Sequence, residues 1–219
     1  MKKAIILLNG EESIPNSIHK MINPEDLVVC ADGGANTALQ MKIKPSIIVG
    51  DFDSLSQKNI EYFKQQGVPF LRFSKEKNET DAEIALRYIA KQKIRDVFIY
   101  GFLGKRSDHF LATLQLPLNQ AFSSLTITFI SDTQFFLYIR KRKVITAPPD
   151  SLITLLPTSR SVSAITTTGL KYPLINESLI YGRSRGVSNV FTHKKAIITV
   201  GRGIVLAIVT PIKASQSQS

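Results

Sequence analysis

Residues 27–54 read LVVCADGGANTALQMKIKPSIIVGDFDS, and this segment indicates the architecture of the first part of the chain. Two short runs rich in β-branched residues, 27–31 and 47–49, are each followed by glycine and aspartate. A stretch of helical character lies between them, so the segment is typical of a strand–helix–strand unit. Such units build mostly parallel sheets that helices cover on both faces.

The same alternation continues on both sides of this segment as far as residue 132. Strands are expected at 4–8, 27–31, 47–49, 69–73, 97–100 and 126–130. Two expected helices begin with capping-box spacing, at Ser54-Leu-Ser-Gln57 and at Thr80-Asp-Ala-Glu83. We therefore expect residues 1–132 to form an α/β domain with a mostly parallel, Rossmann-like sheet.

Helical signals end near residue 132, and the rest of the chain has a different pattern. Short apolar runs separated by glycine and proline predict strands at 134–139, 152–156, 179–181, 196–200 and 204–209. This pattern predicts an all-β sandwich or barrel for residues 133–219.

The composition is that of an ordinary globular protein. The chain has 219 residues, 43% of them hydrophobic and 21% charged, which excludes collagen-like and disordered chains. The lone cysteine, Cys30, excludes an intrachain disulfide and a cysteine-based zinc site, and it fits a reducing cytoplasm. No apolar run approaches the ~20 residues that a membrane-spanning helix needs, so no membrane partner is expected.

Positive charge is concentrated in the second part of the chain. Residues 1–132 hold 16 basic and 15 acidic side chains, whereas residues 133–219 hold 12 basic and 2 acidic ones. The densest run, 140–143, reads RKRK and is expected at a hairpin turn or a strand edge. A basic domain fits a polyanion such as nucleic acid, but a solvated basic surface explains it more simply. The cations lack the interleaved aromatics that stack on bases, so nucleic acid is not favoured as a partner.

Five aspartates follow the expected strands of the first part, directly or at the next helix start. They are Asp32, Asp51, Asp53, Asp81 and Asp108. Ligands bind outside the carboxyl ends of parallel strands, so these acids should crowd at one edge of the sheet. Two carboxylates about 4 Å apart repel by ~4 kcal/mol at an effective dielectric constant of 20. A hard cation such as Mg²⁺, bound by carboxylate and phosphate oxygens, would offset this repulsion.

Residues suited to phosphate accompany these acids. Gly33-Gly34 would let the backbone approach an anion, and Arg106 offers a planar guanidinium beside Asp108 and His109. Each has a plainer explanation alone, since an aspartate after a strand is often a cap or turn former. Taken together, they predict nucleotide-dependent phosphoryl or pyrophosphoryl transfer.

Six motifs, in this order, resemble the bacterial thiamine pyrophosphokinase family over nearly the whole chain. They are 31–36 (ADGGAN), 50–54 (GDFDS), Thr80-Asp81 with Glu83, 104–109 (GKRSDH), 169–174 (GLKYPL) and Ser188-Asn189. The resemblance implies transfer of the terminal pyrophosphate of ATP to the hydroxyl of thiamine, with Mg²⁺ and with release of AMP. It implies a homodimer with active sites between subunits, an α/β catalytic domain at 1–132 and a thiamine-binding β-sandwich at 133–219.

The resemblance also implies roles for individual residues. Metal ligands would be Asp51, Asp53 and Asp81. Catalytic residues would be Asp51, Asp53, Asp81, Arg106 and Asp108. Contacts to ATP and its phosphates would come from Asp32, Gly33, Gly34, Asn36, Lys77, Thr80, Arg106 and His109. Contacts to thiamine would come from Tyr172, Ser188 and Asn189.

Three positions depart from the family pattern: Asn78 replaces an acid, Lys105 a glycine and Thr113 an asparagine. We expect them to tune affinity and to leave activity in place.

Two alternatives stay open at this stage. One is the same chemistry on another hydroxymethyl acceptor, such as a pterin alcohol, and the other is a non-catalytic protein that binds nucleic acid.

Overall fold

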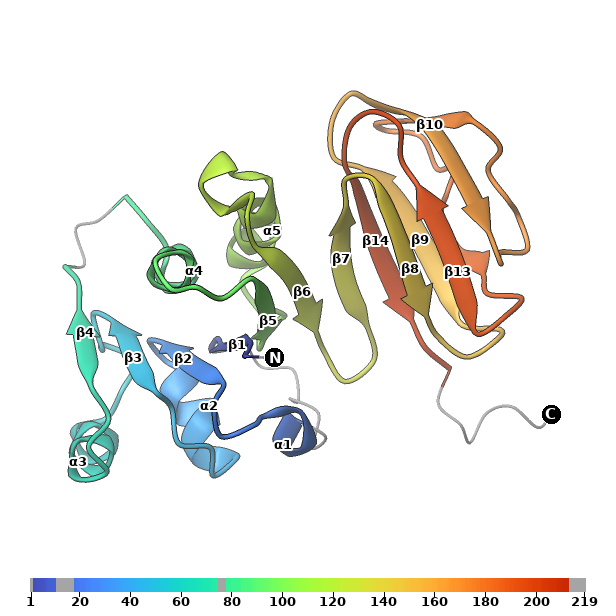
Figure 1. Cartoon of the computed structure of the whole chain (residues 1–219). Coiled ribbons are helices and arrows are strands. Elements are labelled where there is room, and N and C mark those ends of the chain that lie inside the picture. The colour runs from blue at the N-terminus through green and yellow to red at the C-terminus, as the bar shows by residue number, and fades with distance from the viewer. Residues whose placement is uncertain (1, 11–17, 75–77, 213–219) are drawn as a thin grey trace. The chain divides into compact units, whose positions relative to one another are not determined.

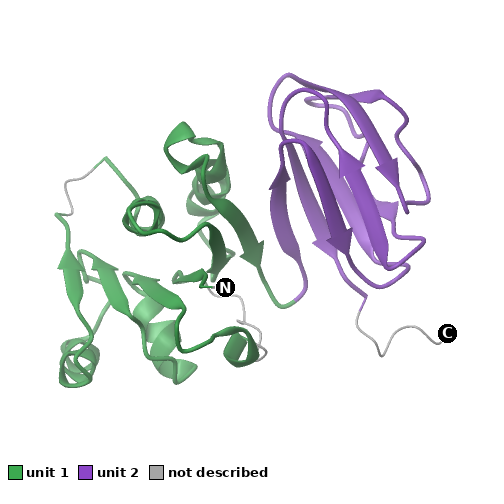
Figure 2. Ribbon diagram, in the orientation of Figure 1, with its two compact units in different colours: residues 1–132 green, residues 133–219 purple. Residues whose placement is uncertain are grey.

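The structure is a computed structural model that describes residues 2–10, 18–74 and 78–212 (Figure 1). The chain divides into two compact units, Met1–Asp132 and Thr133–Ser219 (Figure 2). The division falls where helical signals end in the sequence.

Unit 1 contains a parallel sheet. Its strands are β1 (Ala4–Leu7), β2 (Leu27–Ala31), β3 (Ile47–Gly50), β4 (Phe70–Arg72), β5 (Asp96–Tyr100) and β6 (Thr126–Ile130). All pairs among them are parallel, in the order β4-β3-β2-β1-β5-β6. The α/β prediction is therefore confirmed in general form. The Rossmann-like detail is not confirmed. The strand order reverses between β1 and β5, with four strands on one side of this point and two on the other, whereas a Rossmann sheet has three on each side.

The helices of unit 1 lie on both faces of this sheet (Figure 1). They are α1 (Ile18–Met21), α2 (Gly34–Gln40), α3 (Gln57–Gln65), α4 (Asp81–Ala90) and α5 (Ser107–Gln115), followed by the 3₁₀ turns η1 (Leu116–Leu118) and η2 (Gln120–Phe122). The first three cover one face, and α4 and α5 cover the other. In the described ranges, no helix is long and apolar enough to cross a membrane.

Side-chain caps determine where α3 and α4 begin. Thr80 caps α4 as expected, and its hydroxyl oxygen accepts a hydrogen bond from the Glu83 N–H at 3.2 Å. The expected cap at Ser54 is wrong, because Ser56 caps α3 by accepting from the Asn59 N–H at 3.2 Å. Two serines lie two residues apart, and the spacing alone could not choose between them. Ser54 is thereby left for another role.

Gly34 lets α2 pack directly against β1. A Cβ atom at this position would lie 1.9 Å from the Leu7 carbonyl oxygen, which is far inside any van der Waals contact. The sequence suggested that Gly33-Gly34 admits a ligand. The structure shows instead that the second glycine admits a strand of the protein itself.

Cys30 lies in the middle of β2, where it pairs with Leu7 of β1 and Ile48 of β3. Its side chain is fully buried, and this burial raises the pKa of the thiol far above its ordinary value.

A buried ion pair attaches the start of β1 to the turn before β2. The Lys3 ammonium lies 2.6 Å from Asp26 Oδ2, and the Asp26 side chain has no exposed surface. The Lys3 and Asn23 backbone N–H groups donate to the same carboxylate at 3.0 and 2.8 Å. Burial on its own raises the pKa of Asp26, but these hydrogen bonds and the Lys3 charge outweigh it, so the pKa lies below its ordinary value.

We expect Asp26→Asn to lower the free energy of unfolding at pH 7 by about 2–3 kcal/mol. A carboxyl whose pKa is lowered by folding stabilises the protein above its unfolded-state pKa of ~3.9, and this contribution is lost as the pH falls through the folded-state value. Urea unfolding at pH 7 and pH 3 should therefore show a deficit that shrinks in acid. Glu25→Gln, at an exposed neighbour, is the control. An equal deficit at both pH values would contradict the assignment.

Unit 2 is all β, and its two sheets are antiparallel. One has the order β12-β9-β14-β7, and the other β11-β10-β13-β8. The bounds are β7 (Phe135–Ile139), β8 (Arg142–Thr146), β9 (Leu152–Pro157), β10 (Ser161–Thr168), β11 (Glu177–Ile180), β12 (Asn189–Val190), β13 (Lys195–Thr199) and β14 (Val205–Thr210). Buried residues of both sheets, such as Leu155 and Ile198, share one core, as in a β-sandwich.

The sequence did not predict strands β8, β10 and β12. In β8 only Ile145 is buried, so the apolar signal is weak. In β10 a bulge with Ala164 at φ 53° interrupts the alternation of buried and exposed residues. The basic run 140–143 opens the edge strand β8, so the expected strand edge is confirmed. The expected hairpin turn is wrong, because β7 and β8 belong to different sheets and the turn between them connects the two.

Candidate active site

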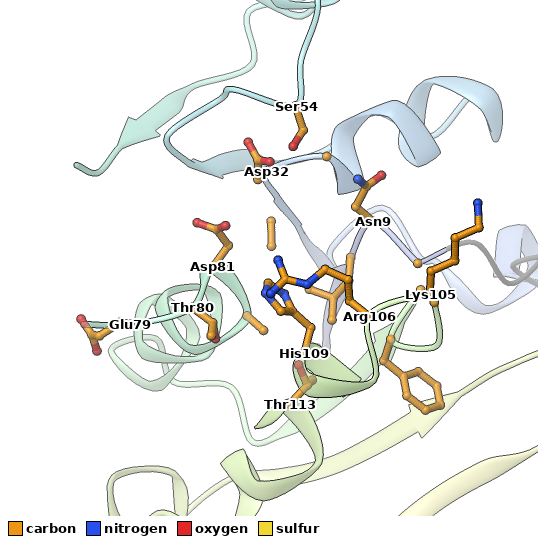
Figure 3. A pocket seen from close by; sticks show the side chains of 18 residues that line it. Asn9, Asp32, Ser54, Glu79, Thr80, Asp81, Lys105, Arg106, His109 and Thr113 are labelled. Atoms are coloured by element: carbon orange, nitrogen blue, oxygen red, sulfur yellow. The ribbon is translucent and has the colours of Figure 1, made fainter. Parts of the chain in front are cut away.

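A pocket of about 550 Å³ opens at the carboxyl ends of the unit 1 strands (Figure 3). It lies where the strand order reverses between β1 and β5, and its volume is typical of a small-molecule site. Its polar and glycine lining includes Asn9, Gly10, Asp32, Gly33, Ser54, Glu79, Thr80, Asp81, Gly101, Gly104, Lys105, Arg106, His109 and Thr113.

Three carboxylates meet at the edge of this pocket, which Asp32 lines and which Asp51 and Asp53 do not. Asp32, Asp51 and Asp53 each offer an oxygen, and these oxygens all lie within 4.8 Å of one another. We call these three residues the acidic group. The sequence assigned the metal to Asp51, Asp53 and Asp81, but the structure brings Asp32 into the close group. Asp81 is the first residue of α4 and lies beside Asp32 on the pocket wall (Figure 3).

A buried aromatic ring between two aspartates fixes the loop after β3. Phe52 is buried at φ 68°, with its ring edge-to-face on Phe70 at 5.2 Å. Because this side chain enters the core, its neighbours Asp51 and Asp53 are left to form the acidic group. Gly50 has φ 145°, and a Cβ there would lie 3.0 Å from the Cβ of Asp32, so glycine allows the two strand ends to approach.

Asp32 is the buried member of the acidic group. Burial raises the pKa of its carboxyl, and the charges of Asp81 and Asp51 raise it further, although contacts with Ser54 and the Gly33 N–H oppose the rise. Its Oδ1 atom is buried, and no described residue donates a hydrogen bond to it. A buried carboxylate oxygen that lacks a donor and faces other carboxylates fits a hard divalent cation, whose preferred ligands are oxygens.

Arg106 and His109 lie together on the α5 side of the pocket (Figure 3). The Arg106 guanidinium binds Asp108 through two hydrogen bonds, Nη2–Oδ2 at 2.5 Å and Nε–Oδ1 at 3.2 Å. This pairing lowers the pKa of Asp108 to about 2. Asp108 does not line the pocket, so in this structure it contacts the pocket residue Arg106 rather than the cavity.

The remaining predicted phosphate contacts differ in their placement. Gly33 and Thr80 line the pocket, whereas Gly34 and Asn36 do not. The Asn36 amide is bound within the protein, since it donates to the Ser54 carbonyl at 3.0 Å and accepts from Asn59 Nδ2 at 2.9 Å. Lys77 lies outside the described residues.

Sequence reasoning missed several lining residues. Asn9 and Gly10 come just after β1, so the criterion that found the aspartates would have found Asn9 if it had included amides. Ser54 was missed because it was assigned to a helix cap. Of the three departures from the family pattern, Lys105 and Thr113 line the pocket, whereas Asn78 is exposed outside it.

The predicted thiamine contacts lie together in unit 2. Asn189 is buried, and its Oδ1 accepts from the Tyr172 N–H at 3.0 Å while its Nδ2 donates to the Tyr172 carbonyl at 2.7 Å. Tyr172 is half exposed, and the Lys171 ammonium lies 5.6 Å from its ring centroid. Ser188 is exposed at φ 54°, and its N–H donates to Thr154 Oγ1 at 3.1 Å. Asn189 therefore uses its amide to hold the main chain of Tyr172.

Comparisons with known proteins agree with these features. The family model described as thiamin pyrophosphokinase, catalytic domain, matches residues 18–129, and the one described as thiamin pyrophosphokinase, vitamin B1 binding domain, matches residues 142–205. The chain is 26% identical to thiamine pyrophosphokinase of Bacillus subtilis (strain 168), covering 95% of this chain and 98% of that protein. It is 26% identical to thiamine pyrophosphokinase 1 of Oryza sativa subsp. japonica, covering 94% and 86%.

The fold also agrees with that of a solved structure. The crystal structure of thiamine pyrophosphokinase from Bacillus subtilis superposes with a TM-score of 0.87 at 24% identity, covering 97% of this chain and all of that one. Since the catalytic-domain model alone matches more than half of the residues, the chain belongs to the thiamin pyrophosphokinase family.

Proposed function

We propose that this protein transfers the terminal pyrophosphoryl group of ATP to the hydroxyl of thiamine, giving thiamine diphosphate and AMP. The observation that carries the proposal is the pocket of unit 1. Its lining includes Asp32, whose buried Oδ1 has no donor among the described residues and which lies beside Asp51 and Asp53, and it also includes Arg106 and His109, side chains suited to phosphate. The family membership and the names of the relatives support the choice of donor and acceptor.

In this proposal, Asp32, Asp51 and Asp53 would hold Mg²⁺, and Asp81, whose charge acts on Asp32, would add to the negative charge of the site. When bound, the ion would neutralise the charge of the acids and of the transferred phosphates. Arg106 would exchange its hydrogen bonds with Asp108 for hydrogen bonds to phosphate oxygens. The Thr80 hydroxyl accepts a hydrogen bond in the helix cap and would donate its proton to a phosphate oxygen. The nucleotide would lie at the reversal of strand order, as in Rossmann-like sheets. The chain's own groups thus position the reactants and neutralise charge.

The acceptor side is proposed to use the Tyr172 ring and the Ser188 hydroxyl. Asn189 would act by holding Tyr172 in place, since both of its amide atoms already bind the Tyr172 backbone.

We expect Asn189→Ala to raise the KM for thiamine about tenfold, because losing these hydrogen bonds frees the Tyr172 main chain; tenfold corresponds to ~1.4 kcal/mol. The KM for ATP should change less than about twofold, since the nucleotide residues lie in the other unit. Steady-state kinetics with each substrate varied would measure both. Asn189→Asp, which keeps the acceptor and loses the donor, should be intermediate. Equal rises in both KM values would indicate general damage instead.

We also propose a homodimer with active sites shared between subunits, working in the cytoplasm. The dimer is supported by exposed apolar side chains in unit 2, such as Ile175 and Tyr181, which are 75% and 72% exposed. The cytoplasmic location is supported by the lone buried cysteine. Light scattering on the purified chain would measure its oligomeric state.

The function is tested by incubating the protein with ATP, Mg²⁺ and thiamine and identifying the nucleotide product. AMP together with thiamine diphosphate is expected. ADP would instead mean transfer of a single phosphoryl group. If no product formed with thiamine but the protein turned over a pterin alcohol, the proposed acceptor would be the pterin alcohol. No observation in the described residues favours nucleic acid binding as the function.

A further inference from the structure

The loop 51–54 carries two of the three carboxylates of the acidic group, yet it belongs to neither a helix nor a strand. Within the loop, Asp51 Oδ1 accepts from the Asp53 N–H at 3.1 Å, and the Ser54 hydroxyl donates to Asp53 Oδ1 at 3.2 Å. These contacts shape the loop, and the Ser54 side chain also contacts Asp32. Attachment on one side comes from Phe52, which is buried in the core.

Attachment on the other side comes from Asn36, in the first turn of α2. Its Nδ2 donates to the Ser54 carbonyl at 3.0 Å, and its Oδ1 accepts from Asn59 Nδ2 at 2.9 Å. The orientation of this amide follows from the chemistry, because a carbonyl oxygen can only accept. The nitrogen must face Ser54, so the oxygen faces Asn59 of α3, which donates. Ser54, Asn36 and Asn59 thus form a chain of hydrogen bonds from the loop to two helices.

The other member of the acidic group needs no such support. Asp32 directly follows β2, and its backbone N–H donates to the Val49 carbonyl at 2.7 Å. The like charges of Asp51 and Asp53 push the loop away from this fixed carboxylate. A contact that holds the loop in place therefore keeps the three sets of oxygens ready for a cation.

We infer that Asn36 is a positioning residue for the cation site: its carboxamide holds loop 51–54 against Asp32, although Asn36 itself does not line the pocket. The inference deepens the proposed function and rests on it only for the assignment of a divalent cation to the acidic group. It replaces direct contact with ATP, the role that the sequence suggested for this side chain.

The inference is tested by titrating the full chain with Mn²⁺ in the absence of nucleotide and thiamine. The concentration of free Mn²⁺ is measured by electron paramagnetic resonance. Asn36→Ala should weaken Mn²⁺ binding about tenfold, and Asn36→Asp, which cannot donate to the Ser54 carbonyl, should weaken it as much. Asn59→Ala should weaken binding about threefold and have no further effect in the Asn36→Ala background, because Asn59 acts only through Asn36. Gln57→Ala is the matched control, since this amide of α3 donates to Glu61 at 3.0 Å and not to the loop.

A second measurement separates positioning from general damage. In the transfer assay, Asn36→Ala should raise the Mg²⁺ concentration for half-maximal rate about tenfold and change kcat at saturating Mg²⁺ less than about twofold. The inference would be overturned if Asn36→Ala bound Mn²⁺ with wild-type affinity, or if Gln57→Ala lost as much Mn²⁺ affinity as Asn36→Ala. It would also be overturned if the unaltered protein did not bind Mn²⁺. If Asn36→Ala does not fold, Asn59→Ala decides by the same criteria. If Mn²⁺ binding depends on Asn36 but no thiamine diphosphate forms, the inference stands and the proposed function fails.

Discussion

Asp32→Asn is expected to lower kcat about a hundredfold or more while raising the melting temperature by about 2 °C. The loss follows from removing the one buried charge of the acidic group, whose Oδ1 has no hydrogen-bond donor within residues 2–10, 18–74 and 78–212. The gain in stability follows from the raised pKa of this carboxyl. An acid whose pKa is raised by folding destabilises the folded protein at pH values above both its pKa values, and a neutral amide has no such effect.

The backbone makes this substitution a clean probe. Asp32 has φ 42°, and asparagine tolerates this left-handed region better than most residues. Asp150→Asn is the matched control, because Asp150 is exposed outside the pocket at φ 67°. Kinetics at pH 7 and melting curves at pH 7 and pH 3 would measure both effects. The stability gain should vanish at pH 3, below the ordinary aspartate pKa of ~3.9. A fully active variant would exclude Asp32 from the site.

Gly34→Ala is expected to produce the largest loss of stability, about 3 kcal/mol in the free energy of unfolding. The added methyl group would overlap the Leu7 carbonyl, which belongs to the backbone of β1 and cannot rotate away. α2 must then shift from the sheet, and it carries Gly33 and Asn36 with it. Turnover should therefore fall as well.

Urea unfolding at neutral pH would measure this loss. Gly67→Ala is the control, because a Cβ added there would have no atoms within 4 Å. Gly67 has φ 71°, so this variant should lose only the ~1 kcal/mol that alanine costs in the left-handed region. If the two alanine variants lost the same stability, the close approach of α2 to β1 would not matter.

Much of the site could be predicted from sequence because strand ends are local features. Each of Asp32, Asp51 and Asp53 follows a β-branched run, and parallel strands bring their carboxyl ends to one edge. Asp81 lines the pocket as well, because α4 begins at this edge, whereas its predicted role as a metal ligand stays a prediction. Which three acids lie closest depends on the turn at Phe52 and the approach at Gly50, and neither is visible in a pattern of apolar residues.

The amides were harder to predict. The resemblance implies ligand contacts for Asn36 and Asn189, which stay predictions, and the structure adds that each binds backbone atoms 17 or 18 residues away in the chain. A polar side chain in a motif looks the same whether it touches a ligand or supports a residue that does. Only the tertiary fold, which places Ser54 beside Asn36 and Tyr172 beside Asn189, distinguishes the two cases.

The buried thiol of Cys30 has a practical consequence. It is the single cysteine of the chain, and a thiol with a strongly raised pKa and no exposed surface does not react with maleimides in the folded protein. A fluorescent or spin label could therefore be attached at an exposed polar position of β11 such as Ser178 through Ser178→Cys, with the native cysteine left in place. Such a label would report on changes in unit 2 in an otherwise unaltered sequence.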